Sequence, residues 1–440
     1  GGASRAAPDV GTGCMSGEAA EAAARAARGA YGRLVSHLAW RWRDLAAAED
    51  ALGDALLTAL QRWPVDGVPD SPEGWLLAVA RRELLQSARH ARLVERLADD
   101  PLLRALCPRE DDPAPEPLLQ AQPVPDQRLR LMLVCAHPAI DPAVRTPLML
   151  QAVLGLDATR IAAAFLVSPA AMAQRLVRAK QKIAQAGMAF EEPDAVAPER
   201  VHAVLEAVYA AYGLAWERWG APADEGAASA ELASEALFLA ELCAGLLPGD
   251  AEALGLWALM LFCESRRDAR FVAGPDGEPW FVPLHEQDTA RWHGGLLRQA
   301  EALLRQAVAL GDLGPYQLEA AIQSAHAQRA LTGRVPWASI ARLYEALLAI
   351  APTRGAEVGH AVAVGTSQGP AAGLALLDGM PVTQRQTYAP WWVARCHLLE
   401  AARERGSAAQ ACAQALGLSE DPRLRAHLGR KLQALRAAPP

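Results

Sequence analysis

Alanine and other apolar residues recur at helical spacing over most of the 440 residues. The segment "EAAEAAARAARGAYGRLVSHLAWRW" (18–42) shows the pattern. Hydrophobic residues make up 52% of the chain, whereas runs of β-branched residues, which favour strands, are rare. Because alanine has the highest helix propensity and the apolar spacing is that of a helix, the sequence predicts an all-α fold.

Two segments rich in proline and acidic residues divide the chain. The first, 99–126, is typical of a linker, with one short helix expected at 102–107. The second, 188–199, is typical of a hinge. They leave three helical modules, at 15–98, 127–187 and 200–440.

The first module contains a loop and a cationic helix. Pro, Gly and Asp cluster at 64–72, which predicts a loop, and Ser71 is a candidate cap for the next helix, with Pro72 in its first turn. The apolar residues expected to form the core of this helix are Trp75, Leu76, Val79, Leu84 and Leu85. Its cationic side chains include Arg81, Arg82 and Arg89.

Charge is distributed unevenly along the chain. The net charge is −7, yet residues 127–187 carry 8 basic and 2 acidic residues, and residues 188–440 carry a net charge of −8. A basic surface favours nucleic acid, because each contact with a phosphate releases counterions. The asymmetry therefore predicts a basic module beside an acidic one.

Several classes of protein are disfavoured by the sequence. We find no uncharged apolar stretch of 18 residues and no signal-peptide core near the start, where Met15 is a candidate initiator and residues 1–14 a leader or cloning remnant. The 7 cysteines are scattered without paired spacing, as in reduced proteins. We therefore expect a cytoplasmic protein that does not span a membrane.

The densest run of positive charge follows a short turn within 157–187. Asp157 is expected to cap a first helix that buries Ile161, Ala162 and Phe165, and Pro169 to begin a second helix after a turn at 166–168. The second helix should bury Met172, Leu176, Ala179 and Ile183. It should expose Gln174, Arg175, Arg178, Lys180 and Gln181.

Two short helices with a tight turn and a cationic second helix are what a helix-turn-helix DNA reader requires. An ordinary helical hairpin with a solvated charged face fits the same pattern, and these residues alone do not decide between the two.

From residue 200 onward the chain is helical and loosely repetitive, which favours stacked helical hairpins. The segment 269–284 interrupts the helices and predicts a surface β-hairpin. The segment 285–293, "HEQDTARWH", would place Asp288, Arg291 and Trp292 on one helical face. We expect a salt-bridged cap there, with a ligand or partner site as the alternative.

The order of modules and several stretches together resemble the extracytoplasmic-function type of RNA polymerase sigma factor. The closest resemblance is to its bacterial subfamily with a tetratricopeptide-like C-terminal domain. The resembling stretches are "AEDALGDALLTALQRWPVDGVPDSPEGWLLAVARR" (48–82), residues 126–187, "EQDTARW" (286–292), "GPYQLEAAIQSAHA" (314–327) and "AVAVGTSQGPAAGLALLD" (361–378). The resemblance implies a sigma region 2-like domain, a region 4-like helix-turn-helix domain and a tetratricopeptide-like array, in that order.

The resemblance also implies roles for individual residues. The residues implied to bind core RNA polymerase, which sigma factors contact at the β′ clamp helices and the β flap, are Glu49, Asp50, Asp54 and Leu57. The residues implied to contact the −10 element of promoter DNA are Arg81, Arg82 and Arg89. Those implied to contact the −35 element are Gln174, Arg175, Arg178, Lys180 and Lys182. A sigma factor is not an enzyme, and the resemblance implies no cofactor.

The appended domain implies a form of regulation. The family controls sigma activity through such a domain, and here the acidic residues 188–440 follow a basic module. We therefore expect the C-terminal domain to pack on the sigma-like modules and to restrict the basic helix, with a freely tethered, solubilising array that only offers a binding groove as the alternative.

The chain also departs from the family pattern. The helix after Trp75 has Arg82 and Gln86 where an Asn and an Asp are usual, and residues 15–100 carry 11 basic against 13 acidic residues. A second hypothesis is therefore a sigma-derived protein that has lost promoter recognition and regulates by binding a protein or ligand. Cys135 and His137 lack further ligands at zinc spacing, so we interpret them as structural and expect no metal.

Overall fold

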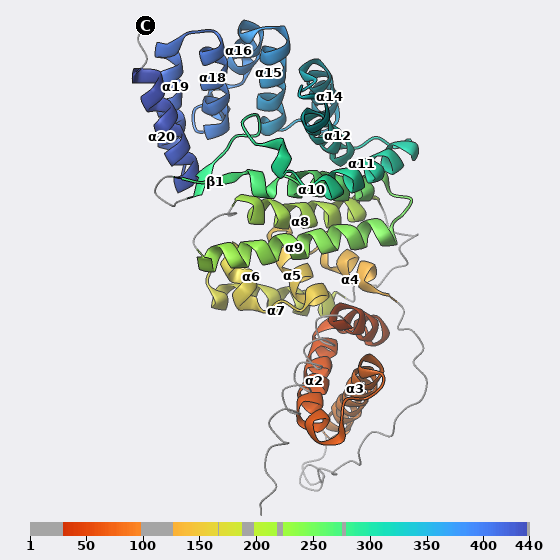
Figure 1. Ribbon diagram of the computed structural model, residues 1–440. Helices are drawn as coiled ribbons and strands as arrows, with labels where there is room; N and C mark the ends of the chain where they lie inside the picture. The colour runs from red at the N-terminus through yellow and green to blue at the C-terminus, as the bar shows by residue number, and fades with distance from the viewer. Residues whose placement is uncertain are drawn as a thin grey trace, which may run out of the picture. The chain divides into compact units, whose positions relative to one another are not determined.

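The computed structural model describes residues 30–97, 126–165, 167–186, 198–217, 223–274 and 279–437. Almost all of these residues are helical, which confirms the all-α prediction (Figure 1). The contacts divide the chain into two compact units. Of the described residues, the first unit holds those up to Glu217 together with Ala227–Glu235, and the second holds the rest. The helix expected at 102–107 lies outside the described residues.

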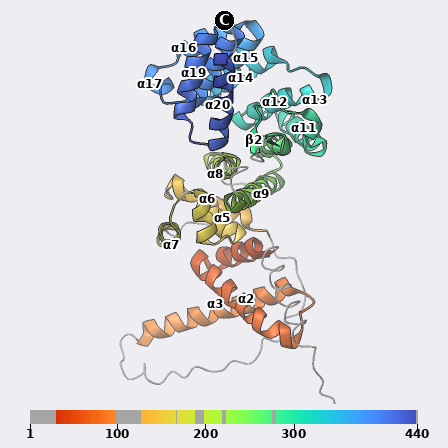
Figure 2. The ribbon, with the colours of Figure 1, turned by 60° about the vertical axis from the view of Figure 1, so that its left-hand side comes forward.

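The first unit begins with a helical stretch at 30–42, followed by α2 (Leu45–Asp66) and α3 (Pro72–Leu97). Helices α2 and α3 pack against each other (Figure 2). The Asp44 side chain caps α2 by accepting a hydrogen bond from the Ala47 amide at 3.0 Å. Ser71 caps α3, as expected, through a 3.4 Å bond from the Gly74 amide.

The loop expected at 64–72 is shorter than the sequence indicated. Helix α2 continues through Pro64 to Asp66, and the Gly67 amide closes its last turn on the Trp63 carbonyl. Proline usually ends a helix because it lacks a donor and crowds the preceding turn. Here Trp63 is buried and meets Trp75 edge-on, 5.5 Å between ring centres, so packing offsets the local cost.

The predicted core of α3 is right in part. Leu76, Val79 and Leu84 are buried, whereas Leu85 is 50% exposed. Adjacent residues on a helix point about 100° apart, so only one of the Leu84–Leu85 pair can face the core.

The rest of the first unit is a group of short helices. They are α4 (Arg128–Cys135), α5 (Pro142–Leu154), α6 (Ala158–Phe165), α7 (Pro169–Gln185) and α8 (Pro198–Glu217). Asp157 accepts hydrogen bonds from the amides of Thr159 and Arg160, and Ser168 caps α7. The predicted starts of α6 and α7 are therefore confirmed.

Helix α8 belongs to this group, although the sequence placed a hinge before residue 200. It packs on α4, α5 and α6. The Thr146 hydroxyl donates to the Ala207 carbonyl at 3.1 Å, and the Arg200 guanidinium donates to the Leu133 carbonyl at 2.8 Å. The division into modules at 188–199 stays a prediction, because the compact unit continues past it.

Residues 30–42 pack closely against α5 through two glycines. A Cβ atom on Gly32 would lie 2.0 Å from the Val153 carbonyl oxygen. Gly155 ends α5 with a φ of +70°, and a Cβ atom there would lie 2.8 Å from the Tyr31 ring. The absence of side chains at both positions lets the two backbones approach.

The second unit is a succession of helices that pack on their neighbours in chain order (Figure 1). Its helices are α9 (Ala223–Leu246), which spans both units, α10 (Ala251–Glu264), α11 (Gly294–Ala309), α12 (Pro315–Ala327), α13 (Arg329–Thr332), α14 (Trp337–Ile350), α15 (Arg354–Gln368), α16 (Pro370–Gly379), α17 (Val382–Arg385), α18 (Ala389–Ala401), α19 (Arg405–Leu418) and α20 (Pro422–Ala437). Small residues line the contacts: Ala341 and Ala363 lie in one core cluster, and Ala408 and Ala411 in another. No described helix combines the length and the apolar character needed to cross a bilayer.

The insert at 269–284 forms the expected hairpin. Strands β1 (Phe271–Ala273) and β2 (Pro279–Phe281) are antiparallel, with Phe271 opposite Phe281.

The helical face expected at 285–293 is wrong. Only one 3-10 turn forms, η4 (Thr289–Arg291), and Trp292 has extended backbone. Asp288 caps this turn at the Ala290 amide, as the capping interpretation requires, but Arg291 donates to the Phe271 carbonyl at 3.2 Å.

The glycine packing gives a test with a matched control. Gly32→Ala should destabilise the contact of residues 30–42 with α5, because the new methyl group overlaps the Val153 carbonyl. Gly53→Ala, inside α2 with nothing within 4 Å, should instead stabilise by about 1 kcal/mol. Hydrogen exchange of 45–66 and 142–154 in the full chain measures both. Equal stabilisation by the two substitutions would contradict the packing.

Candidate functional site

Helix α7 has one buried face and one cationic face, as predicted. Met172, Leu176, Ala179 and Ile183 are buried. The exposed polar residues on the helix include four of the predicted DNA-binding residues, Gln174, Arg175, Arg178 and Lys182. Three positive charges on one exposed helix face are suited to contacts with phosphates.

Lys180 is the exception on this helix. Its ammonium group lies 2.6 Å from a carboxylate oxygen of Glu49 on α2, and the two side chains are only 15% and 11% exposed. The sequence predicted Lys180 to face outward and assigned the two residues to different partners. The structure brings a predicted DNA-binding residue and a predicted polymerase-binding residue together in one buried ion pair.

The ion pair is costly to bury. Burial raises the pKa of Glu49 above its ordinary value, although Lys180 acts in the opposite direction. The other carboxylate oxygen, Oε1, is buried without a hydrogen-bond partner among the residues that the structure describes. A pair of this kind adds little stability by itself, but removing one partner leaves an uncompensated charge.

The surroundings of the pair are also buried. Burial raises the pKa of Tyr31, with smaller contributions from Glu49 and Asp50. Burial also raises the pKa of Cys135, which keeps the thiol protonated. His137 accepts a hydrogen bond from the Ala139 amide at 3.1 Å. The Cys135 thiol is therefore neither exposed nor activated, and the structural interpretation of His137 stays a prediction.

The remaining predicted residues of α2 are available at the surface. Asp50 and Asp54 are exposed, and Leu57 is 59% exposed. Leu60 is also exposed, at 45%. Two carboxylates beside exposed leucines can receive a basic, partly apolar helix of another protein.

The predicted cations of α3 differ among themselves. Arg89 is exposed and Arg82 is half-buried. Arg81 is exposed, but its Nη2 lies 2.9 Å from Nε2 of His37. Burial, together with Arg81 and Arg41, lowers the pKa of His37, so the neutral ring nitrogen accepts the hydrogen bond. Arg81 therefore has a structural contact besides any contact with DNA.

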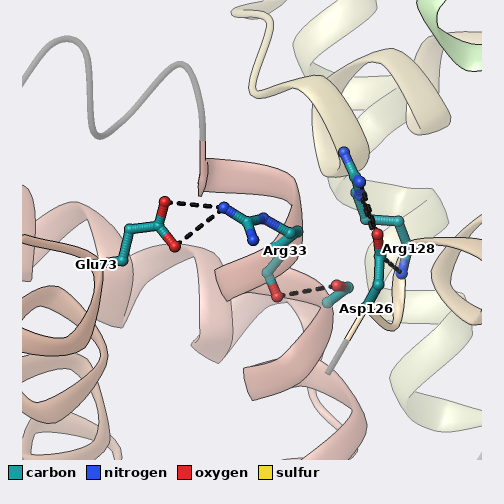
Figure 3. A network of polar contacts seen from close by, with 5 residues as sticks. Arg33, Glu73, Asp126 and Arg128 are labelled. Carbon is teal, nitrogen blue, oxygen red and sulfur yellow. Dashed lines mark hydrogen bonds and ion pairs between the residues drawn. The ribbon is translucent and has the colours of Figure 1, made fainter. Parts of the chain in front are cut away.

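Arg33 and Arg128 each form an ion pair in this part of the unit (Figure 3). Arg33 donates to both carboxylate oxygens of Glu73, at 2.8 and 3.0 Å, and ties residues 30–42 to the start of α3. Arg128 pairs with Asp126, with 2.6 Å between Nη2 and Oδ2, at the start of α4. Arg33 and Glu73 lie 40 residues apart, and Glu49 and Lys180 lie 131 apart, so no local spacing signals either pair.

Among the described residues no group of three or more His, Cys, Asp and Glu side chains is arranged to hold a metal ion.

Comparisons with known proteins agree with part of this arrangement. Sigma-70 region 2 matches residues 29–94, which cover the helical stretch at 30–42, α2 and most of α3. A family of unknown function, DUF6596, matches residues 200–308. No solved structure matches the chain significantly.

Two relatives were found. A probable RNA polymerase sigma factor, RfaY, of Xanthomonas campestris pv. campestris is 33% identical over 144 residues, which are 32% of this chain and 34% of that protein. The uncharacterized protein R00370 of Rhizobium meliloti (strain 1021) is 37% identical over 338 residues, which are 77% of this chain and 78% of that protein. The chain therefore belongs to the family of the Rhizobium meliloti protein, and its region 2 makes it a sigma-factor-like protein.

Proposed function

We propose that the protein is a transcription initiation factor that binds core RNA polymerase and promoter DNA and has no catalytic activity or cofactor of its own. In this proposal α3 contacts the −10 element, α7 contacts the −35 element, and the helices that follow form a tetratricopeptide-like regulatory domain. The protein acts in the cytoplasm, where its partners are.

The observation that carries the proposal is the exposed polar face of α7. Its opposite face is buried by four apolar residues, so the helix is held firmly while Gln174, Arg175, Arg178 and Lys182 face solvent. In such an arrangement side chains near the start of the helix meet base edges, and cations further along lie over phosphates. Gln174 is then the base-reading candidate, and the three cations position the helix.

The exposed face of α2 supports the contact with polymerase. Sigma factors dock this segment on the β′ clamp helices, and Asp50, Asp54 and Leu57 are free to make that contact. Glu49 joins them only when it leaves Lys180.

The ion pair supports a closed state of the free protein. Neither Glu49 nor Lys180 can serve its proposed partner while each is buried against the other. Helix α8, the first helix of the acidic region, packs on the same group of helices as α7 and fits a restraint from that side. We therefore propose that polymerase, DNA or both open the contact between α2 and α7.

A second candidate is a sigma-derived regulator that binds a protein or ligand without recognising promoters. The same ion pair favours it, because it removes one cation from the α7 face and one carboxylate from the α2 face.

The DNA contacts can be tested by salt dependence. Arg175→Ala, Arg178→Ala and Lys182→Ala should each weaken binding to all sequences similarly and lower the slope of log K against log salt by roughly one. Arg342→Ala, an exposed cation on α14, is the control and should change nothing. The measurement is fluorescence anisotropy with a promoter duplex. Binding that is independent of salt in the unchanged protein would favour the second candidate.

The polymerase contact can be tested by equilibrium binding to purified core enzyme. Leu57→Ala and Asp54→Ala should each weaken binding about fivefold or more, because both side chains are exposed on the proposed docking face. Val308→Ala on α11, with a similar exposure of 61%, should leave the affinity unchanged. Equal affinities for all three variants and the unchanged protein would exclude α2 as the docking face.

The closed state predicts an unusual effect of Lys180→Met. Removing the ammonium leaves Glu49 buried without a partner, a cost of about 3–5 kcal/mol for a buried pair. Hydrogen exchange in 45–66 and 169–185 should become faster by roughly tenfold or more, and polymerase should bind more tightly because less free energy is needed for opening. Lys182→Met, which changes an exposed lysine on the same helix, should alter neither. Slower or unchanged exchange in Lys180→Met would contradict the closed state.

A further inference from the structure

The second unit contains a pocket of 230 Å³ beside the segment 285–293. Its walls come from the turn after β2, from α12 and α13, and from α14 and α15. The lining residues that define its chemistry are His285, Trp292, His326, Arg329, Trp337 and Tyr344. None of the ten residues that line it is acidic.

One wall is held in place by Arg329. Its guanidinium lies 5.2 Å from the centre of the Trp292 ring and donates hydrogen bonds to the main-chain carbonyls of His285 and Gln287. The Trp292 indole nitrogen donates to the Gln287 side chain at 3.3 Å, and Trp292 is buried. The segment that the sequence singled out therefore forms a fixed aromatic wall attached to α13.

The opposite wall is aromatic as well. A Cβ atom on Gly359 would lie 2.5 Å from the outer end of the Tyr344 ring, so glycine at this position makes room for the tyrosine beside α15. His326 meets Trp337 edge-on, with 5.3 Å between ring centres and an angle of 82°.

Three of these side chains carry polar atoms that the described part of the protein leaves without a hydrogen-bond partner. They are the ring nitrogens of His326, the indole nitrogen of Trp337 and the hydroxyl of Tyr344. Each of these atoms is at least partly exposed, because none is among the fully buried side-chain atoms that lack a hydrogen-bond partner. A largely apolar pocket with a few converging polar groups is the usual form of a small-molecule site.

The polar groups are mainly hydrogen-bond donors, and Arg329 is the fully charged side chain among the ten lining residues. Burial, then Arg266 and Arg329, lower the pKa of His326 to about 4, so the ring is neutral at physiological pH. Burial, then Glu319, raise the pKa of Tyr344 to about 12, so its hydroxyl keeps its proton. Aromatic walls also suit organic cations, but a lining arginine without a lining carboxylate disfavours them.

We propose that this pocket binds a small aromatic carboxylate, with its ring between the aromatic walls and its carboxylate held by Arg329, Trp337 and Tyr344. The volume is below the roughly 300–1,000 Å³ of pockets for drug-sized ligands, which limits the ligand to one small ring system. The site is separate from the residues assigned to polymerase and DNA, so it adds a ligand-binding activity to the second unit.

The test is ligand-observed saturation-transfer NMR on the full chain, with benzoate and phenylacetate as probes and benzylamine as the cationic counterpart. At least one carboxylate should bind at millimolar concentration or below, and benzylamine should not. Tyr344→Phe removes one donor to a charged group and should weaken binding about tenfold. Gly359→Ala should abolish binding by forcing the Tyr344 ring out of its place.

Tyr388→Phe, a change on another half-buried tyrosine outside the pocket, is the control and should leave binding intact. Circular dichroism verifies that the variants are folded. If Gly359→Ala does not fold, Tyr344→Phe still tests the proposal. The proposal is overturned if neither carboxylate binds, if benzylamine binds as well as they do, or if Tyr344→Phe and Tyr388→Phe bind equally.

Discussion

The buried ion pair between Glu49 and Lys180 joins the two parts of the first unit that carry the proposed function. It does not hold them together by its own strength. Burial raises the pKa of Glu49 in spite of the nearby ammonium, and Oε1 has no partner within the described residues. Tyr31 lies near enough to Glu49 for that charge to raise its pKa, and residues 30–42 pack closely against α5, where Gly32 and Gly155 admit the neighbouring backbone and ring. A charged contact that is costly to bury, held by packing beside it, is suited to opening when another protein offers Glu49 a better-solvated cation.

This arrangement separates what local sequence can predict from what it cannot. The start of α6 at Asp157 and of α7 at Ser168-Pro169 follow from capping preferences, which act within three residues. The buried face of α7 follows from its helical period. Lys180 occupies a position on the same helix that the period marks as outward, and only a residue from α2 gives it a buried partner. Tertiary contacts of this kind leave no trace in spacing.

Two errors in the fold predicted from the sequence have the same origin, a contact between residues far apart in the chain. Helix α2 continues past Pro64 because Trp63 is anchored against Trp75, a contact between residues that the sequence placed on either side of a loop. The segment 285–293 forms a short turn rather than a helix because Arg291 and Arg329 bind main-chain carbonyls around it. The lining of the pocket was not foreseen for the same reason: His326, Arg329, Trp337 and Tyr344 come together only through the packing of α12 to α15. The family of unknown function that matches 200–308 includes Trp292 and the turn beside it, whereas the opposite wall lies beyond that match.

Of the two families that match the chain, only the one that matches its first part has a known function. Residues 29–94 match region 2 of sigma-70 proteins, and the relative from Rhizobium meliloti extends the likeness over most of the chain. Region 2 thus makes the chain sigma-factor-like, and α2 and α7 are joined by the ion pair between Glu49 and Lys180, on which the proposed closed state rests. The most direct measurement is the distance between spin labels at the exposed positions Gln61 on α2 and Gln185 on α7, recorded by pulsed electron resonance with and without core polymerase. The free protein should give one short, narrow distance distribution, and bound polymerase should shift it to a longer distance. A broad distribution in the free protein, or one that polymerase does not change, would contradict the closed state.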